Sequence, residues 1–133
     1  MIINNIVDVY PVEDDLRDYK FFCFNGNVKF FKVDFGRFTE HHANYYSTDG
    51  KLLPYGELVC PPKDDASIQL PSNLKEMIVV AQNLSSGIPF LRVDLYNVNG
   101  KIYFGELTFY PASGLSRWTD DKWDREIGDM LEL

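Results

Sequence analysis

Apolar residues recur along this chain in short runs that predict β-strands. The first half of the chain contains such runs at residues 2–9, 19–24, 28–33 and 43–47. Their side chains are largely β-branched and aromatic, which are the types enriched in strands. Asn25-Gly26 separates the second run from the third and supplies the positive φ angles that a tight hairpin turn requires. We therefore expect a β-hairpin over residues 19–33.

Residues 74–84 show helical periodicity instead. The apolar side chains that would share one face of this helix are Leu74, Met77, Ile78, Ala81 and Leu84. Asn73 and Glu76 have capping-box spacing, in which each side chain satisfies a backbone N–H at the helix start, and Gly87 suits the C-terminal stop. A last helix is expected after Thr119, because this N-cap residue type is followed by two aspartates in the first turn.

Two further strands are expected between these helices, over residues 90–96 and 101–109. The order of elements is then strands, helix, strands, helix, which is typical of an α+β fold with a mostly antiparallel sheet and two helices. We expect residues 1–133 to form a single domain, because too little chain remains beside this sheet to build a second core.

The loop of the second hairpin decides which side chains meet across its strands. Residues 97–101 suit a three-residue loop, in which a type I turn is followed by glycine in the left-handed region as a bulge. That register sets Asp94 opposite Phe104 and Arg92 opposite Glu106. A two-residue loop would shift the pairing by one residue and separate Asp94 from Glu106.

The same register predicts the two faces of the hairpin, because side chains alternate along a strand. One face would carry Phe90, Arg92, Asp94, Phe104, Glu106 and Thr108. The opposite, apolar face would carry Leu91, Val93, Leu95, Tyr103, Leu107 and Phe109.

The first of these faces has candidate chemistry. Asp94 and Glu106 on neighbouring strands form an oxygen-rich patch, and Mg²⁺ in proteins usually binds one or two carboxylates together with substrate phosphate. Arg92 beside them could hold a phosphate or a carboxylate through its planar guanidinium. The alternative is a solvated strand face, on which Arg92 and Glu106 form a cross-strand pair worth about 0.2–1 kcal/mol.

Composition limits the classes of function. The 20 acidic and 13 basic residues give a net charge of −7, which argues against a nucleic-acid partner, and 15% aromatic residues exclude intrinsic disorder. No apolar run is long enough for a membrane span. Cys23 and Cys60 have no metal-ligand spacing, so free thiols and a cytoplasmic location are expected.

Two segments carry a resemblance to a known family. Residues 90–96 together with 105–114 resemble the metal-binding hairpin of ATP-grasp enzymes, and residues 18–26 resemble the ATP-grasp family associated with teichuronopeptide and other cell-surface polysaccharide biosynthesis. Members of that family are often labelled glycosyltransferases. The resemblance covers roughly residues 18–133 and implies the C-terminal subdomain of the ATP-grasp fold.

This resemblance implies site residues, with Mg²⁺ and ATP as cofactors. Asp94 and Glu106 would be the Mg²⁺ ligands, and Thr108 stands where many relatives have an asparagine ligand. Lys20 would contact phosphate. The catalytic candidates are Arg92, facing an acyl phosphate or the acceptor, and Arg37, near phosphate or substrate. The alternatives are ordinary surface roles for Lys20 and Arg37.

The resemblance also implies a reaction and its partners. The family phosphorylates a carboxylate with MgATP, after which an amine or thiol attacks the acyl phosphate, so a nucleotide and a carboxylate- or sugar-type substrate are the expected partners. No Gly-rich loop precedes Asp18. We therefore expect a chain that lacks the N-terminal lobe and lid and is inactive alone. The alternative is a non-catalytic binding or assembly module, for which a homodimer would cover the exposed sheet face.

Overall fold

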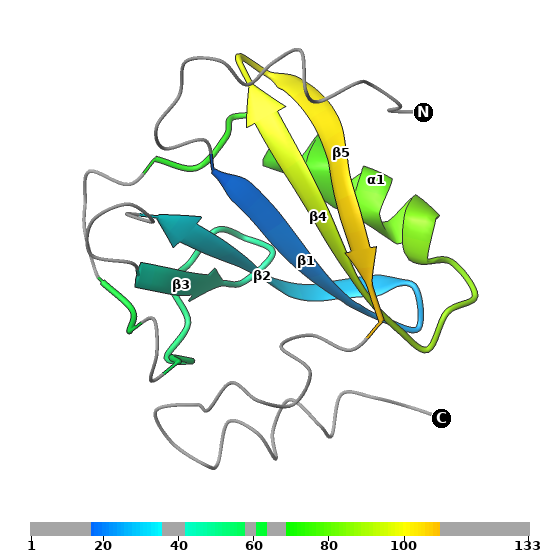
Figure 1. The fold of residues 1–133 in the computed structure, drawn as a ribbon, viewed down its shortest axis with the longest axis horizontal. Helices are drawn as coiled ribbons and strands as arrows, with labels where there is room; N and C mark the ends of the chain where they lie inside the picture. The colour runs from blue at the N-terminus through cyan, green and yellow to red at the C-terminus, as the bar shows by residue number, and fades with distance from the viewer. Residues whose placement is uncertain (1–16, 36–41, 58–60, 64–68, 110–133) are drawn as a thin grey trace.

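The computed structural model describes residues 17–35, 42–57, 61–63 and 69–109. They form an α+β fold in which one helix covers one face of an antiparallel sheet with strand order β3-β2-β1-β4-β5 (Figure 1). The elements are β1 (Asp18–Phe24), β2 (Asn27–Phe35), β3 (His42–Tyr46), α1 (Leu74–Ser85), β4 (Phe90–Val98) and β5 (Lys101–Thr108).

The described part confirms the antiparallel sheet, the strand near residues 43–47 and the helix at residues 74–84. It contains one helix rather than the two that we expected. The strand predicted at residues 2–9 and the helix predicted after Thr119 lie outside the described residues.

The first hairpin forms as its turn chemistry predicts. Asn25 has φ 54° and Gly26 has φ 81°, so both central residues of the turn lie in the left-handed region that a type I′ turn needs. The pairing of Phe24 with Asn27 leaves only these two residues in the loop. This turn sets β1 and β2 side by side as the middle of the sheet.

The second hairpin corrects the predicted loop. Val98 pairs with Lys101, so the loop contains only Asn99 and Gly100 rather than three residues. Their φ angles of 53° and 83° repeat the turn of the first hairpin. Asparagine tolerates the left-handed region well enough to take the first central position, which is why the shorter loop forms.

A bulge in β5 then changes the register once more. Leu95 pairs with Phe104, but Asp94 pairs with Glu106, so Gly105 is the extra residue. A Cβ atom on Gly105 would lie 2.8 Å from the backbone oxygen of Asp94, so only glycine fits this close approach without a shift of the backbone.

These two corrections alter the predicted faces of the hairpin. Phe104 lies opposite Leu95 and packs against the core beneath α1, whereas Tyr103 lies opposite Tyr96 on the other face, so both assignments were wrong. Leu107 lies opposite Val93 but is 38% exposed because β5 is an edge strand of the described sheet. Phe109, also expected in the core, is 54% exposed.

The main core lies between the sheet and α1, which packs on β1, β2 and β4. Alternate residues of these strands point toward the helix. The fully buried residues of this core include Phe21, Phe31, Leu91 and Leu95 from the strands and Met77 from the helix. The helix ends as predicted, because Gly87 just beyond it has φ 79°, a left-handed conformation that glycine adopts without a Cβ penalty.

The start of α1 differs from the predicted capping box. Asn73 is the N-cap residue, but its side chain makes no capping hydrogen bond. Its amide nitrogen instead donates to the backbone oxygen of Gly100 at 2.8 Å, and its oxygen accepts from Asn97 at 2.7 Å. Asn73 therefore ties the helix start to the turn between β4 and β5, because that turn lies within reach of its amide.

The other face of the sheet has no helix of the described part on it and divides into two regions. One end is an aromatic cluster of Phe22, Phe24, Phe30, Tyr45 and Tyr55, with Phe90 and Leu53 packed against it. Phe22 and Phe30 stack with ring centroids 4.6 Å apart. The other end of this face carries ionised side chains, and it contains most of the predicted site.

Candidate cation and phosphate site

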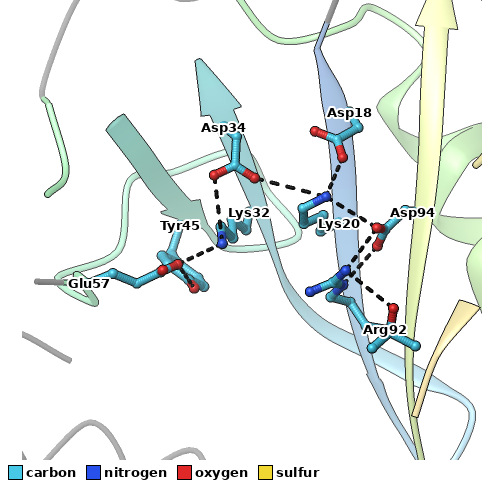
Figure 2. A network of polar contacts seen from close by, with 9 residues as sticks. Asp18, Lys20, Lys32, Asp34, Tyr45, Glu57, Arg92 and Asp94 are labelled. Carbon is cyan, nitrogen blue, oxygen red and sulfur yellow. Dashed lines mark hydrogen bonds and ion pairs between the residues drawn. The ribbon is translucent and has the colours of Figure 1, made fainter. Parts of the chain in front are cut away.

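A continuous network of charged side chains crosses the helix-free face of the sheet (Figure 2). Its side chains come from β1, β2 and β4 and from Glu57, which follows β3 in the chain. The charged members are Asp18, Lys20, Lys32, Asp34, Glu57, Arg92 and Asp94, which are four acids and three bases. Among the described residues the network therefore has a formal charge of −1, and each of these side chains is at most 13% exposed.

Asp94 is the most enclosed acid of this network, with a side chain that is 3% exposed. Arg92 binds the Asp94 carboxylate from the same strand, because side chains two residues apart on a strand share a face. Arg92 donates from Nε to Oδ1 at 2.9 Å and from Nη2 to Oδ2 at 3.0 Å. Arg92 Nη2 also donates to Thr108 Oγ1 at 3.2 Å, across the β4–β5 pair. Arg92 thus faces Thr108 rather than Glu106, as the register requires.

Lys20 lies at the centre of three aspartates. Its ammonium donates to Asp94 Oδ2 at 3.1 Å and to Asp18 Oδ2, and it lies 4.0 Å from Asp34 Oδ2. Pairing of Lys20 with Asp94 across β1 and β4 brings these groups together. The structure therefore places Lys20 beside the predicted metal ligand, as a partner of carboxylates.

Glu106 lies directly opposite Asp94 and is exposed. The predicted carboxylate pair is thus on one face of neighbouring strands. The Gly105 bulge, rather than a three-residue loop, produces the register that brings the two acids together. Thr108 follows on the same face of β5, so Asp94, Glu106, Thr108 and Arg92 are brought together. Arg37 lies outside the described residues.

The donor chemistry decides what this pair could hold. The described residues contain no group of three or more His, Cys, Asp or Glu side chains arranged for a metal ion. Two carboxylates are nevertheless the protein share of many Mg²⁺ sites in which phosphate oxygens and water complete the coordination. Asp94 and Glu106 therefore fit a Mg²⁺ ion bound together with phosphate, and not one held by protein groups alone.

The second half of the network was not anticipated from the sequence. Lys32 lies opposite Lys20 and donates to Glu57 Oε2 at 2.7 Å, while Asp34 Oδ1 lies 3.6 Å from its ammonium. Tyr45 donates its hydroxyl proton to Glu57 Oε2 at 2.5 Å. Because side chains alternate along a strand, the sequence of β2 could have predicted that Lys32 and Asp34 share a face. The contact of Glu57 with Lys32 could not be predicted in this way, because Glu57 lies outside the strands and far from the end of β3 in the chain.

Burial raises the pKa of the Tyr45 hydroxyl well above its usual value of 10.0, and the neighbouring charge of Glu57 raises it further. Tyr45 is thus a neutral donor at physiological pH. Its position at the boundary of the aromatic cluster and the charged network joins the two regions of this face.

Cys23 has no part in this site. Cys23 is a free thiol in the core under α1, and burial raises its pKa to about 11, so it is inert as a nucleophile at neutral pH. Cys60 lies outside the described residues.

Within the described part of the chain, no helix has the length and apolar character that crossing a membrane requires.

Comparison with known protein families gives a match over nearly the whole chain. The family model described as "TupA-like ATPgrasp" matches residues 1–132. No curated protein and no solved structure matches the chain.

Proposed function

Because this chain belongs to the TupA-like ATP-grasp family, we propose that its helix-free sheet face binds MgATP in an ATP-dependent carboxylate–amine or carboxylate–thiol ligase. The single observation that carries this proposal is the direct opposition of Asp94 and Glu106 beside Arg92 and Lys20. This arrangement supplies oxygen ligands for a cation and cationic groups for phosphate on one surface. We further propose that the product enters cell-surface polysaccharide synthesis, which is the association of the family that the sequence resembles.

Each residue has a defined part in this reaction. A bound Mg²⁺ ion would neutralise phosphate charge, and Asp94 and Glu106 would hold it. Arg92 can bind the transferring phosphoryl group through its planar guanidinium, and Thr108 orients that guanidinium through the 3.2 Å hydrogen bond. A substrate carboxylate oxygen attacks the γ-phosphorus, and the bond to the ADP oxygen breaks. The acceptor amine or thiol would then attack the acyl carbon, the bond between that carbon and the phosphate oxygen would break, and the proton of the acceptor would pass to the released phosphate or to water.

Binding and turnover are distinct expectations for this chain. Phosphoryl transfer depends on groups that position the phosphates from more than one side. The described residues offer groups on one sheet face. We therefore expect the 133-residue chain to bind MgATP but to hydrolyse it slowly.

The test is a calorimetric titration of the purified chain with the Mg²⁺ complex of a non-hydrolysable ATP analogue. Asp94→Asn and Glu106→Gln should each weaken binding by about tenfold or more, because each removes a charged cation ligand. Glu76→Gln is the matched control, since Glu76 is an exposed acid in the first turn of α1. Equal affinity of the wild type and both site variants would contradict the proposal.

One observation favours a second candidate, a non-catalytic binding or assembly module. Both carboxylate oxygens of Asp94 already accept hydrogen bonds from Arg92 and Lys20. Such pairing is also expected of an ion-pair network that has only a structural role. This module would fold with the same network and bind neither metal nor nucleotide. The titration above separates the two candidates, and sedimentation of the chain tests the predicted homodimer.

A further inference from the structure

The carboxylate proposed as a cation ligand is already neutralised by the chain itself. Asp94 accepts three hydrogen bonds from two cationic side chains, at 2.9 Å and 3.0 Å from Arg92 and at 3.1 Å from Lys20. The Asp94 side chain is 3% exposed, so these contacts lie in a poorly hydrated region where a charge pair is strong. A divalent ion that approached Asp94 would therefore meet two positive charges.

Each of the two cationic side chains has an alternative acceptor besides Asp94. Lys20 is already bonded to Asp18, and Asp34 lies 4.0 Å from its ammonium, so two carboxylates would still balance its charge if it left Asp94. Arg92 has the Thr108 hydroxyl as a second acceptor. A phosphate at this surface would give the guanidinium an anionic partner of the geometry that it prefers.

From this arrangement we propose that Lys20 and Arg92 are resident counter-cations of Asp94, which leave that carboxylate only when a divalent cation and phosphate arrive together. This inference rests on the proposed function and adds an order of binding to it. Free metal binds weakly because the resident charges oppose it. Phosphate favours release of Asp94 because it gives the Arg92 guanidinium a new anionic partner, while Lys20 keeps Asp18 and Asp34. Metal and phosphate therefore strengthen each other's binding, beyond the affinity that they have for one another in water.

Lys20 serves here as a positioning residue, and its neighbour across the sheet provides a matched control. Lys32 pairs directly with Lys20 in the β1–β2 register, and the two side chains are equally exposed at 13%. Lys32 contacts Glu57 and Asp34 but has no contact with Asp94. Removal of either charge changes the network by one unit, and only removal of the Lys20 charge relieves Asp94.

The first measurement is a titration of the 133-residue chain with Mn²⁺ alone, followed by the electron paramagnetic resonance signal of free Mn²⁺. Lys20→Met should bind Mn²⁺ about tenfold more tightly than the wild type or better, because an opposite charge at this range shifts a carboxylate equilibrium by roughly 1–3 logarithmic units. Lys20→Arg and Lys32→Met should bind Mn²⁺ like the wild type. Lys20→Met/Asp94→Asn should lose the gain.

The second measurement repeats the titration with a saturating, non-hydrolysable ATP analogue, corrected for Mn²⁺ held by the analogue in solution. The analogue should raise the Mn²⁺ affinity of the wild type by a larger factor than that of Lys20→Met, because the variant has no Lys20 charge to displace. A merely structural role for Lys20 would weaken both measurements together. It would not make free Mn²⁺ bind more tightly.

The outcomes separate this inference from the proposed function. If the analogue promotes Mn²⁺ binding through Asp94 but Lys20→Met leaves the free-metal affinity unchanged or weaker, the counter-cation inference is wrong and the proposed function stands. If the gain persists in Lys20→Met/Asp94→Asn, the ion binds at Asp18 and Asp34, and the inference is again wrong. If the analogue does not bind but Lys20→Met gains Mn²⁺ affinity through Asp94, the proposed function fails and the counter-cation role stands.

Folding of the variants is monitored by far-ultraviolet circular dichroism and thermal melting. Lys20→Met leaves three aspartates without their shared ammonium, so a loss of stability is expected. Arg92→Met provides a second variant if Lys20→Met does not fold, because it removes the other counter-cation. It should also bind free Mn²⁺ more tightly than the wild type, and weaker binding would contradict the inference.

Discussion

Glu106 lies directly across from Asp94 on the neighbouring strand, although the turn that joins the strands would by itself place Gly105 there. The two-residue turn sets one register near Gly100, and the bulge at Gly105 shifts it before the acidic pair is reached. The predicted three-residue loop was wrong, but the two acids still share a face. The bulge is therefore the feature that assembles the candidate cation site.

Gly105→Ala tests the bulge directly. The new Cβ would lie 2.8 Å from the Asp94 backbone oxygen and 3.0 Å from the Tyr96 ring, so the strands must move apart at this point. We expect a loss of about 1–3 kcal/mol in the free energy of unfolding, measured by urea denaturation. Weaker binding of the Mg²⁺–nucleotide complex should accompany it.

Gly100→Ala is the control for that variant. Gly100 has φ 83°, and a Cβ atom added to it would have no neighbouring atom within 4 Å, so alanine would strain the turn without a clash. We expect a loss of about 1 kcal/mol with little change in nucleotide binding. Equal effects of the two substitutions on nucleotide binding would show that the bulge has no special role in the site.

Asn73→Asp distinguishes helix capping from the contact seen at the β4–β5 turn. Aspartate is as good an N-cap residue as asparagine, so a capping role predicts no loss of stability. The structure instead has the Asn73 amide nitrogen donating to the Gly100 oxygen, and a carboxylate cannot donate that hydrogen bond. We expect a loss of about 1 kcal/mol by urea denaturation. Unchanged stability would favour capping.

Tyr45→Phe should destabilise the fold through Glu57. The phenylalanine keeps the aromatic packing but removes the hydroxyl that donates to Glu57 at 2.5 Å, leaving Lys32 as the contact that balances this buried carboxylate. A loss of about 1–3 kcal/mol in the free energy of unfolding is expected. Restoration of stability by the additional change Glu57→Gln would confirm that the cost arises from the carboxylate.

Cys23 should make stability fall at alkaline pH. Burial raises its pKa from 9.0 to about 11, so the folded protein retains a proton that the unfolded chain loses above about pH 9. The stabilisation is complete below pH 9 and is lost as the pH rises through about 11, by up to about 2–3 kcal/mol. Cys23→Ala should show a smaller decline over this range in urea denaturation. Parallel pH profiles would contradict the assignment.

Several features of this chain could be predicted from the sequence because they depend on neighbours along the chain. The Asn25-Gly26 turn, the helix at residues 74–84 and the glycine stop at Gly87 follow from dihedral preferences and apolar periodicity. The same turn rule, applied to Asn99-Gly100, would have given the correct loop. The shared face of Arg92 and Asp94 also follows from alternation alone.

The rest depended on contacts between residues far apart in the sequence. No local pattern distinguishes Gly105 as a bulge, since the reason is the close approach of the Asp94 backbone on the next strand. Lys20 contacts Asp94 only because β1 lies between β2 and β4 in the sheet. The Asn73 side chain bonds to Gly100 instead of capping the helix only because the β4–β5 turn lies against the helix start. The sequence by itself determined which turns, strands and helix form, because these obey short-range geometry. The tertiary structure alone decided which charges are neighbours, because strand order and register arise from packing of the whole sheet.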